Sequence, residues 1–247
     1  MSKQNIFDNE KFFEGYRTLR ENPDCANNLT EKPALFSMLG EIKGKRILDL
    51  GCGYGENCLA FSKMGARSVT GTDISEKMLA VAQQENTGES IRYLHMPMED
   101  ISALMPERFD IIVSSLAIHY VEDFEKLARD IYSLLTEGGL FLFSQEHPLT
   151  TAPKEGVRWL RSASGETEGY VLTDYAQPGK RCVSWMVDGI LKYHRTFSNI
   201  VNSLCKAGFQ IEEMREPLPP KEAFSRLPSL HKEMHKPNFL LIKARKK

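Results

Sequence analysis

Apolar and polar positions along this chain follow two periods, and the clearest change between them lies in residues 46–74, RILDLGCGYGENCLAFSKMGARSVTGTDI. The first apolar run, Ile47 to Leu50, has the length of a buried strand and stops at three glycines in alternate positions, Gly51, Gly53 and Gly55. Helix-forming sequence follows, and a β-branched run from Val69 to Ile74 predicts a second strand. The segment therefore predicts a βαβ unit with a glycine-rich loop after its first strand.

The same two periods predict further elements. The stretch from Asp123 to Leu135 has the apolar stripe of an amphipathic helix, and Cys182 to Ser198 alternates like a hairpin that turns at Asp188-Gly189. Strands are also expected at 91–96 and 239–244. Helices are expected in the first 45 residues, with a break at Asn22-Pro23-Asp24, after Ser75 as N-cap, at 222–227, and from Ser198, as N-cap, to Gly208.

Composition limits the class of protein. With 32 basic and 33 acidic residues the formal net charge is -1, which gives no sign of the basic stripe that nucleic-acid binding requires. No apolar run approaches the roughly 20 residues of a membrane span, and no signal peptide is recognisable, so we expect a cytoplasmic protein. The five cysteines show neither C-x-x-C nor Cys/His ligand spacing, which indicates reduced thiols and no metal site.

The glycine-rich loop has the chemistry of a nucleoside site. Glycine leaves no Cβ between the main chain and a ligand, and the helix N-terminus behind the loop favours an anionic group. Asp73 ends the second strand about 20 positions after Gly51, where a carboxylate can accept both hydroxyls of a ribose. A dinucleotide fingerprint would need glycine at the position that Glu56 occupies, which disfavours NAD.

The string DLGCGYG from Asp49 resembles the cofactor loop of the class I S-adenosylmethionine-dependent methyltransferases of the small-molecule type. Four more segments resemble that family in its order: DISEKMLAVAQQ, the segment after its second strand; FDIIVSSLAIHYVED, its fourth strand and following turn; LLTEGGLFLF, its helix, double-glycine turn and fifth strand; and LCKAGFQI, its last helix and sixth strand. The resemblance implies an α/β fold with a Rossmann-like, doubly wound sheet of seven strands in the order 3-2-1-4-5-7-6, the last antiparallel, with N-terminal helices and a substrate-cap insert.

The resemblance also implies a cofactor, S-adenosyl-L-methionine, with S-adenosyl-L-homocysteine as product. Family members often carry an acid at the end of the third strand, opposite the adenine amino group, where this chain has Pro97; Glu99 or Asp100 is expected to replace it. The residues expected to bind the cofactor are Asp49, Gly51, Cys52, Gly53, Gly55, Asp73, Ile74, Met78, Met98, Glu99, Asp100, Ser115, Leu116, and, from the leader, Tyr16 and Arg20.

One domain over residues 1–247 fits the length of the chain. We divide it into an N-terminal helical leader (1–45), a cofactor-binding half (46–148), a cap insert with a hairpin arm (149–198) and a C-terminal helix with the last strands (199–247). Residues 149–181 are rich in Ser, Thr, Gly and Lys and carry no periodic pattern, so we expect a structureless lid that orders over the site.

The acceptor of the methyl group cannot be identified from the residues. A general base is needed only for a hydroxyl, thiol or protonated amine, and His119, His147 and His194 are the candidates, expected to surround the acceptor pocket. Tyr120, Glu146, Tyr193 and Arg195 are further pocket candidates. The favoured function is methylation of a small molecule; the alternatives are an RNA- or protein-directed methyltransferase and a non-catalytic S-adenosylmethionine-binding protein.

Overall fold

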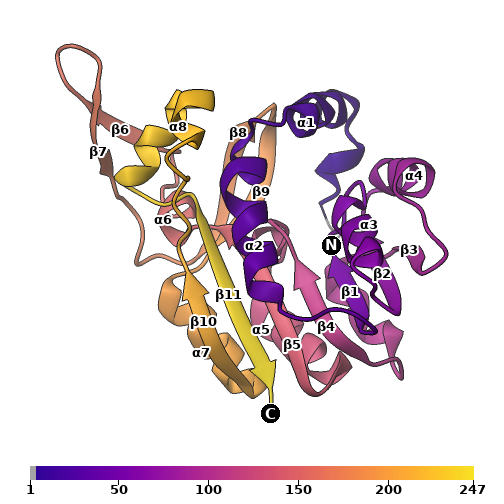
Figure 1. The fold of residues 1–247 in the computed structure, drawn as a ribbon. Coiled ribbons are helices and arrows are strands. Elements are labelled where there is room, and N and C mark those ends of the chain that lie inside the picture. Colours follow the sequence, from indigo (N-terminus) through magenta and orange to yellow (C-terminus); the bar gives the residue numbers. More distant parts are fainter. Residues whose placement is uncertain (1–3) are drawn as a thin grey trace.

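A seven-stranded sheet forms the centre of the protein in the computed structural model, which describes residues 4–247 (Figure 1). Residues 1–3 of the leader lie outside the described part. The strands of the sheet are β1 (Arg46–Leu50), β2 (Ser68–Asp73), β3 (Ile91–His95), β4 (Phe109–Ser114), β5 (Leu135–Glu146), β10 (Phe209–Arg215) and β11 (Phe239–Lys246).

The order across the sheet is β3-β2-β1-β4-β5-β11-β10. The first five strands of the chain pair in parallel, whereas β11 is antiparallel to both β5 and β10. Counting only these seven strands along the chain gives 3-2-1-4-5-7-6, so the predicted order and the antiparallel last strand are confirmed. In such a sheet the carboxyl ends of β1, β2 and β4 meet at one edge, where open α/β sheets bind ligands.

Helices cover both faces of the sheet because the strand residues point alternately to the two sides. Leu48 and Leu50 pack on one side with the helical segments of residues 98–104, 124–134 and 197–207, while Ile47 and Val69 pack on the other with those of residues 32–39 and 56–63. The helices are α1 (Glu10–Glu21), α2 (Lys32–Leu39), α3 (Glu56–Lys63), α4 (Glu76–Glu85), α5 (Phe124–Leu134), α6 (Pro148–Thr151), α7 (Phe197–Ala207) and α8 (Ala223–Arg226). The shorter helical turns are η1 (Ile6–Asp8), the π-helical η2 (Asn27–Glu31), η3 (Met98–Leu104), η4 (Ile118–Tyr120) and η5 (Pro228–Met234). None of the helices in residues 4–247 is long and apolar enough to cross a lipid bilayer.

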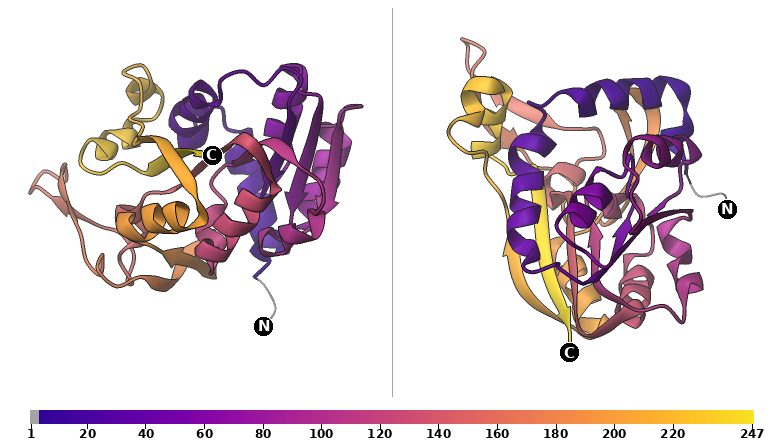
Figure 2. Two further views of the ribbon diagram at one scale, coloured as in Figure 1. Left: turned by 90° about the horizontal axis from the view of Figure 1, so that it is seen from below. Right: turned by 45° about the vertical axis from the view of Figure 1, so that its right-hand side comes forward.

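The insert is not the structureless segment that the sequence predicted. It begins with α6 and then forms a hairpin of β6 (Arg158–Arg161) and β7 (Thr167–Val171), which projects away from the sheet (Figure 2). Most of these strand residues are half-buried or exposed, so no apolar alternation marks them in the sequence. The prediction of a loop over 149–181 was therefore wrong.

The second hairpin of the insert, β8 (Gly179–Trp185) and β9 (Val187–His194), confirms the predicted arm but not its turn. The chain reverses at Met186, which has φ +61°, because Trp185 already pairs with Val187. Asp188-Gly189 instead lies where the register shifts, with Gly189 at φ +82°. The glycine was a correct sign of a left-handed residue, but this residue serves an irregularity in β9 and not the turn.

Two helix N-caps and one C-cap were predicted, and one of the N-caps was wrong. Ser75 caps α4 as expected, by accepting a hydrogen bond from the Met78 amide at 3.0 Å. For α7 the N-cap is Thr196, which forms a capping box with Asn199, and not Ser198. Gly208, at φ +102°, ends α7 as predicted.

The leader and the β8–β9 hairpin meet above the carboxyl ends of the strands. In Figure 1 and the right-hand view of Figure 2, α1 lies at the top of the molecule and the hairpin rises to it. Met186 packs on Gly15 of α1, where an added Cβ would lie 3.3 Å from its sulfur, and the Trp185 and Phe12 rings are 5.5 Å apart. These contacts explain the glycine in the middle of α1. They also join the leader, residues 4–21, to the hairpin, residues 179–194, and we call these two segments together the roof.

Candidate active site

The glycine-rich loop between β1 and α3 has the backbone that its sequence predicts. Gly51, Gly53 and Gly55 all have positive φ, at +70°, +52° and +77°, a region that other residues enter only with strain. The amides of Gly51 and Cys52 donate to the Thr72 carbonyl at 2.8 and 2.9 Å, which fixes the loop to β2. A Cβ built on Gly53 would meet no atom within 4 Å, so the main chain there is open to a ligand.

Asp73 ends β2 and ties the loop to the next helix. One carboxylate oxygen accepts from the Gly53 amide and the other from the Ser75 amide, both at 2.9 Å. Burial raises the pKa of this carboxyl, and the two amide hydrogen bonds act against that rise. Each oxygen keeps a lone pair beyond the one it uses, so the group can still accept two ligand hydroxyls.

A cavity of about 320 Å³ lies over the ends of β1, β2 and β4. Ten of the predicted cofactor residues line it: Tyr16, Gly51, Gly53, Asp73, Ile74, Met78, Met98, Glu99, Ser115 and Leu116. Residues that the sequence did not single out for the site also line it: Gln4, Ile6, Phe7, Met96, Ala117, Val121, Glu122, Lys180 and Leu191, together with Pro97 and the pocket candidates Tyr120 and Tyr193. This volume is in the usual range for a small-molecule site.

The roof of this cavity is held by hydrogen bonds from the first described residues. Gln4 accepts from the Leu191 amide of β9 at 2.6 Å, and the Asn5 side chain donates to the Ile74 carbonyl at 3.0 Å. Asp8 accepts from the Ser75 hydroxyl at 2.6 Å. The start of the leader therefore bridges the cofactor half and the hairpin, a role that no sequence pattern in those residues indicated.

A smaller cavity of about 60 Å³ adjoins the first, and it holds Arg20 and Cys52. Arg20 is 2.7 Å from Glu56, which also pairs with Lys32 at 2.9 Å. Burial works against ionisation of Glu56, but the two cations outweigh it and hold its pKa below the usual range. The Tyr54 hydroxyl beside this cavity is buried and has no hydrogen-bond partner among residues 4–247.

Three predicted cofactor residues line neither cavity: Asp49, Gly55 and Asp100. Asp49 is buried and accepts from the Cys58 thiol at 3.4 Å, and burial raises the pKa of its carboxyl to about 7. At Gly55 an added Cβ would lie 2.2 Å from the Tyr93 hydroxyl, so this glycine makes room for a side chain. Of the two acids proposed for the adenine side, it is Glu99 that reaches the cavity.

The three histidines do not surround the cavity. None of His119, His147 and His194 is among the described residues that line the cavity. The expected pocket between the three histidines is therefore not formed there. His147 is 2.8 Å from Glu216 and caps α6, while His194 contacts Thr151 at 3.0 Å and the Tyr175 carbonyl at 2.9 Å. Burial lowers the pKa of both. Each thus has the partners of a structural residue.

His119 lies directly behind the cavity wall, because its ring is 4.4 Å from that of Tyr120, a lining residue. It is buried, accepts from the Glu146 amide at 3.4 Å, and burial lowers its pKa to about 4. The neighbouring Glu146 carboxylate forms a 2.5 Å ion pair with Lys192. These groups form a packed polar cluster behind Tyr120.

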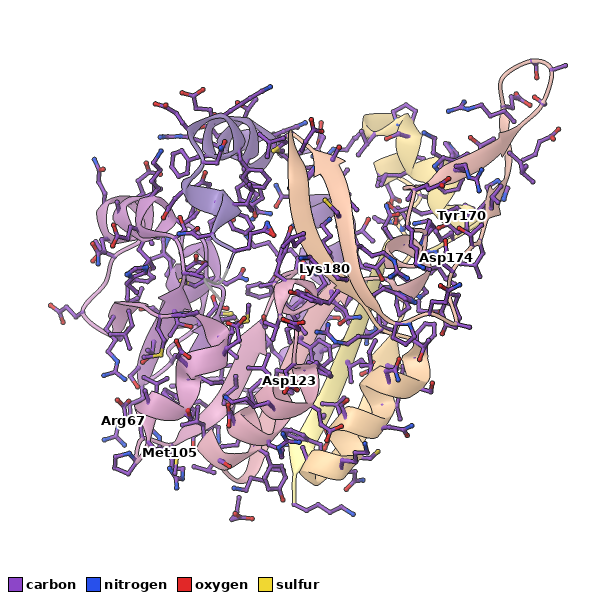
Figure 3. All side chains as sticks on the ribbon, turned by 180° about the vertical axis from the view of Figure 1, so that it is seen from behind. Arg67, Met105, Asp123, Tyr170, Asp174 and Lys180 are labelled. Atoms are coloured by element: carbon purple, nitrogen blue, oxygen red, sulfur yellow. The ribbon has the colours of Figure 1, made fainter. Side chains whose placement is uncertain are left out.

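The hairpin presents one face to the cavity. Lys180 pairs with Tyr193 across the strands, and Leu191 lies two residues before Tyr193, so the three share a side. The Tyr193 hydroxyl is 3.4 Å from Glu122, and Arg195 donates to the carbonyls of Val121 and Glu122, which fixes the segment after β4. Figure 3 labels Lys180 at the end of the β8–β9 hairpin near the sheet, whereas Tyr170 belongs to the β6–β7 hairpin.

Comparison with known proteins places this geometry in a family. The family model described as "Methyltransferase domain" matches residues 48–143. A protein of uncharacterised function from Haemophilus influenzae is 41% identical over 255 residues, covering 99% of this chain and 98% of that protein. The ubiquinone biosynthesis O-methyltransferase of Pseudomonas savastanoi is 37% identical over 105 residues, which span 42% of this chain and 45% of that enzyme.

Solved structures of methyltransferases also resemble this chain. The S-adenosylmethionine-dependent methyltransferase of Mesorhizobium loti is 38% identical, with a TM-score of 0.79, over 87% of this chain and 97% of that one. The 1,6-didemethyltoxoflavin-N1-methyltransferase of Burkholderia thailandensis is 18% identical with a TM-score of 0.59, over 96% and 84%. The second likeness shows the fold alone, whereas the first extends over nearly the whole relative.

Proposed function

The chain belongs to the class I S-adenosylmethionine-dependent methyltransferases, and we propose that it methylates a small molecule held in the larger cavity beneath the β8–β9 hairpin. The methyl donor of this family is S-adenosylmethionine. The observation that carries the proposal is the roof: the leader and the hairpin enclose the outer part of the cavity above the strand ends.

We assign the inner part of the cavity, next to the strand ends, to the cofactor, because the residues there have side chains that suit its parts. Both oxygens of Asp73 retain a lone pair for the two ribose hydroxyls, and the empty space beside Gly53 allows a ligand to lie on the main chain. Met98 and Glu99 are suited to the adenine ring and its amino group. Arg20 and the unpartnered Tyr54 hydroxyl suit the amino-acid end, in the smaller cavity.

The remaining lining residues suit an acceptor. When bound, S-adenosylmethionine supplies a methyl group on a positively charged sulfur that is already a good leaving group. The chain therefore has to align the acceptor and exclude water. Tyr120, Leu191 and Tyr193 offer an apolar and aromatic wall for that purpose, and Lys180 and Glu122 give the outer end one charge of each sign.

An acceptor of low molecular weight fits this arrangement better than RNA or a protein. The hydrogen bond between Gln4 and Leu191 and the contact between Met186 and Gly15 hold the leader and the hairpin together over the strand ends, and a polymer segment needs a more open site than a small molecule does. The net charge of -1 gives no electrostatic attraction for RNA. The partial relative that acts in ubiquinone biosynthesis is consistent with this choice.

A methyl-transfer screen tests the proposal. The purified protein is incubated with isotopically labelled S-adenosylmethionine and pools of small phenols, amines, thiols and acids, and products are read by mass spectrometry. Bulk tRNA and a cell-protein extract serve as polymer acceptors, and Asp73→Ala as the inactive control. We expect label in a small molecule. Label only in RNA or protein would contradict the small-acceptor proposal, and cofactor binding without transfer to any acceptor would favour a non-catalytic binding protein.

A further inference from the structure

A buried carboxylate of the leader is connected to the cavity wall through two serines. Glu31, the last residue of the π-helical turn η2, is only 1% exposed. It accepts hydrogen bonds from the Ser115 hydroxyl at 2.9 Å and from the Ser144 hydroxyl, both through the same oxygen. Ser115 follows β4 and Ser144 lies in β5, so this one side chain joins the leader to the carboxyl ends of two strands.

The connection continues to a strained residue. Leu116 has φ +51°, which is unfavourable for a side chain of this kind and is kept only where the surroundings enforce it. Its amide donates to both the carbonyl and the hydroxyl oxygen of Ser144, at 3.1 and 3.0 Å. Because the Ser144 proton is given to Glu31, its oxygen is free to accept from Leu116. The carboxylate therefore orients the group that holds the strained turn.

The turn after β4, residues 115–117, also contacts the glycine-rich loop. Ser115 and Leu116 line both cavities, and Ala117 lines the larger one. A Cβ on Gly51 would lie 2.5 Å from that of Ala117, so the loop and the turn are packed as closely as a glycine permits. A small shift of the turn would therefore change the shape of the loop. Strained backbone of this kind clusters at functional sites.

We propose that Glu31 is a positioning residue for the cofactor site: through Ser115 and Ser144 it fixes the turn after β4, so that docking of the leader sets the geometry of the glycine-rich loop. The inference rests on the proposed use of these cavities for the cofactor. Arg20 and Lys32 are the cations facing Glu31, and Asp49 and Tyr16 are its other titratable neighbours. Burial raises the pKa of Glu31, and the two hydroxyl donors and two cations oppose that rise.

Calorimetric binding of S-adenosylhomocysteine tests this role. Glu31→Ala removes the acceptor and leaves both serine hydroxyls without it, so we expect the dissociation constant to rise about ten-fold or more. Glu31→Gln keeps an acceptor oxygen of the same shape and should stay within about three-fold of the wild type. The matched control is Glu21→Ala, an exposed acid of α1 that pairs with Arg17 at 3.0 Å.

Ser144→Ala tests the same contact from its other side, because it removes the hydroxyl that lies between Glu31 and the Leu116 amide. It should weaken binding about as much as Glu31→Ala does. The variant that carries both changes should bind no more weakly than either single variant, because both changes interrupt the same series of contacts from Glu31 through Ser144 to Leu116. If Glu31→Ala does not fold, Ser144→Ala and Glu31→Gln decide the matter by the same comparison.

Two failures are distinguishable. Wild-type affinity in folded Glu31→Ala or Ser144→Ala would overturn the positioning role while leaving the cofactor site in place, and so would a lower melting temperature without a change in affinity. A Glu31→Gln variant as weak as Glu31→Ala would also overturn it, because an acceptor oxygen would not be what matters. Absence of binding to the wild-type protein would instead remove the assignment of these cavities to the cofactor, and this inference with it.

Discussion

Burial determines the protonation state of the residues expected to act as bases. His119 is 3% exposed, and its pKa of about 4 means that it is neutral throughout the physiological range. A buried histidine in contact with Glu146 and Tyr120 can be important for stability without touching the acceptor. The sequence showed which side chains can hold a proton, but their surroundings depend on residues far away in the chain.

A pH dependence of stability follows from His119. The unfolded chain takes up a proton below the ordinary pKa of 6.5, whereas the folded protein does so only near 4, so stability is lost as pH falls between these values. We expect the free energy of unfolding to fall by about 1.5 kcal/mol from pH 6.5 to 5, relative to His119→Gln. Urea titrations at both pH values measure this, because other titrating groups are common to the two proteins. Parallel curves for the two proteins would contradict the assignment.

Among the elements, those with a regular pattern were predicted, and those made by tertiary contacts were not. The strand from Ile47 and the helix after Asp123 follow from their apolar periods, which report on burial directly. The β6–β7 hairpin carries no such period because it is not packed into the core. The π-helical turn η2 likewise could not be predicted, since it is stabilised by the contacts of Glu31 with two distant serines.

The N-cap of α7 is Thr196 in the structure and Ser198 in the sequence-based prediction, and unfolding measurements can distinguish the two. Thr196 accepts from the Asn199 amide at 3.2 Å and Asn199 bonds back to the Thr196 amide at 3.1 Å, so Thr196→Ala should cost about 1 kcal/mol of stability. Ser198→Ala, the matched change two residues on, should cost less than about 0.5 kcal/mol. Denaturant unfolding of both variants decides between them, and the reverse ranking would restore Ser198 as the cap.

The β6–β7 hairpin gives a prediction for the expected lid. Of residues 149–181, only Lys180 lines the larger cavity. The β6–β7 hairpin projects away from the sheet (Figure 2). We therefore expect limited proteolysis in the turn at residues 162–166 to proceed at the same rate with and without S-adenosylhomocysteine. Cleavage near residues 4–9 should slow on binding, because this segment forms part of the roof. Protection of the hairpin turn by the ligand would show that the lid hypothesis is right after all.

At the scale of the whole molecule, three distant segments complete a site that the first half of the chain begins. The glycine-rich loop and Asp73 were recognisable from spacing and residue type, because the physical requirements of that loop are local. The outer wall of the cavity combines residues from positions 4–7, 120–122 and 180–193, and only the folded chain brings them together. The outer part of the cavity, where an acceptor would bind, was therefore the part least open to prediction.

The measurement that tests the central claim most directly is calorimetric titration of S-adenosylmethionine into wild-type protein and Asp73→Ala. Asp73 lines the cavity and holds the Gly53 amide, so its loss should raise the dissociation constant by a factor that corresponds to roughly 2 to 4 kcal/mol. Asp110→Ala is the matched control, since Asp110 pairs with Arg46 at the opposite ends of the strands and should leave affinity unchanged. Equal affinity in wild type and Asp73→Ala, or tighter binding of NAD than of S-adenosylmethionine, would contradict the account.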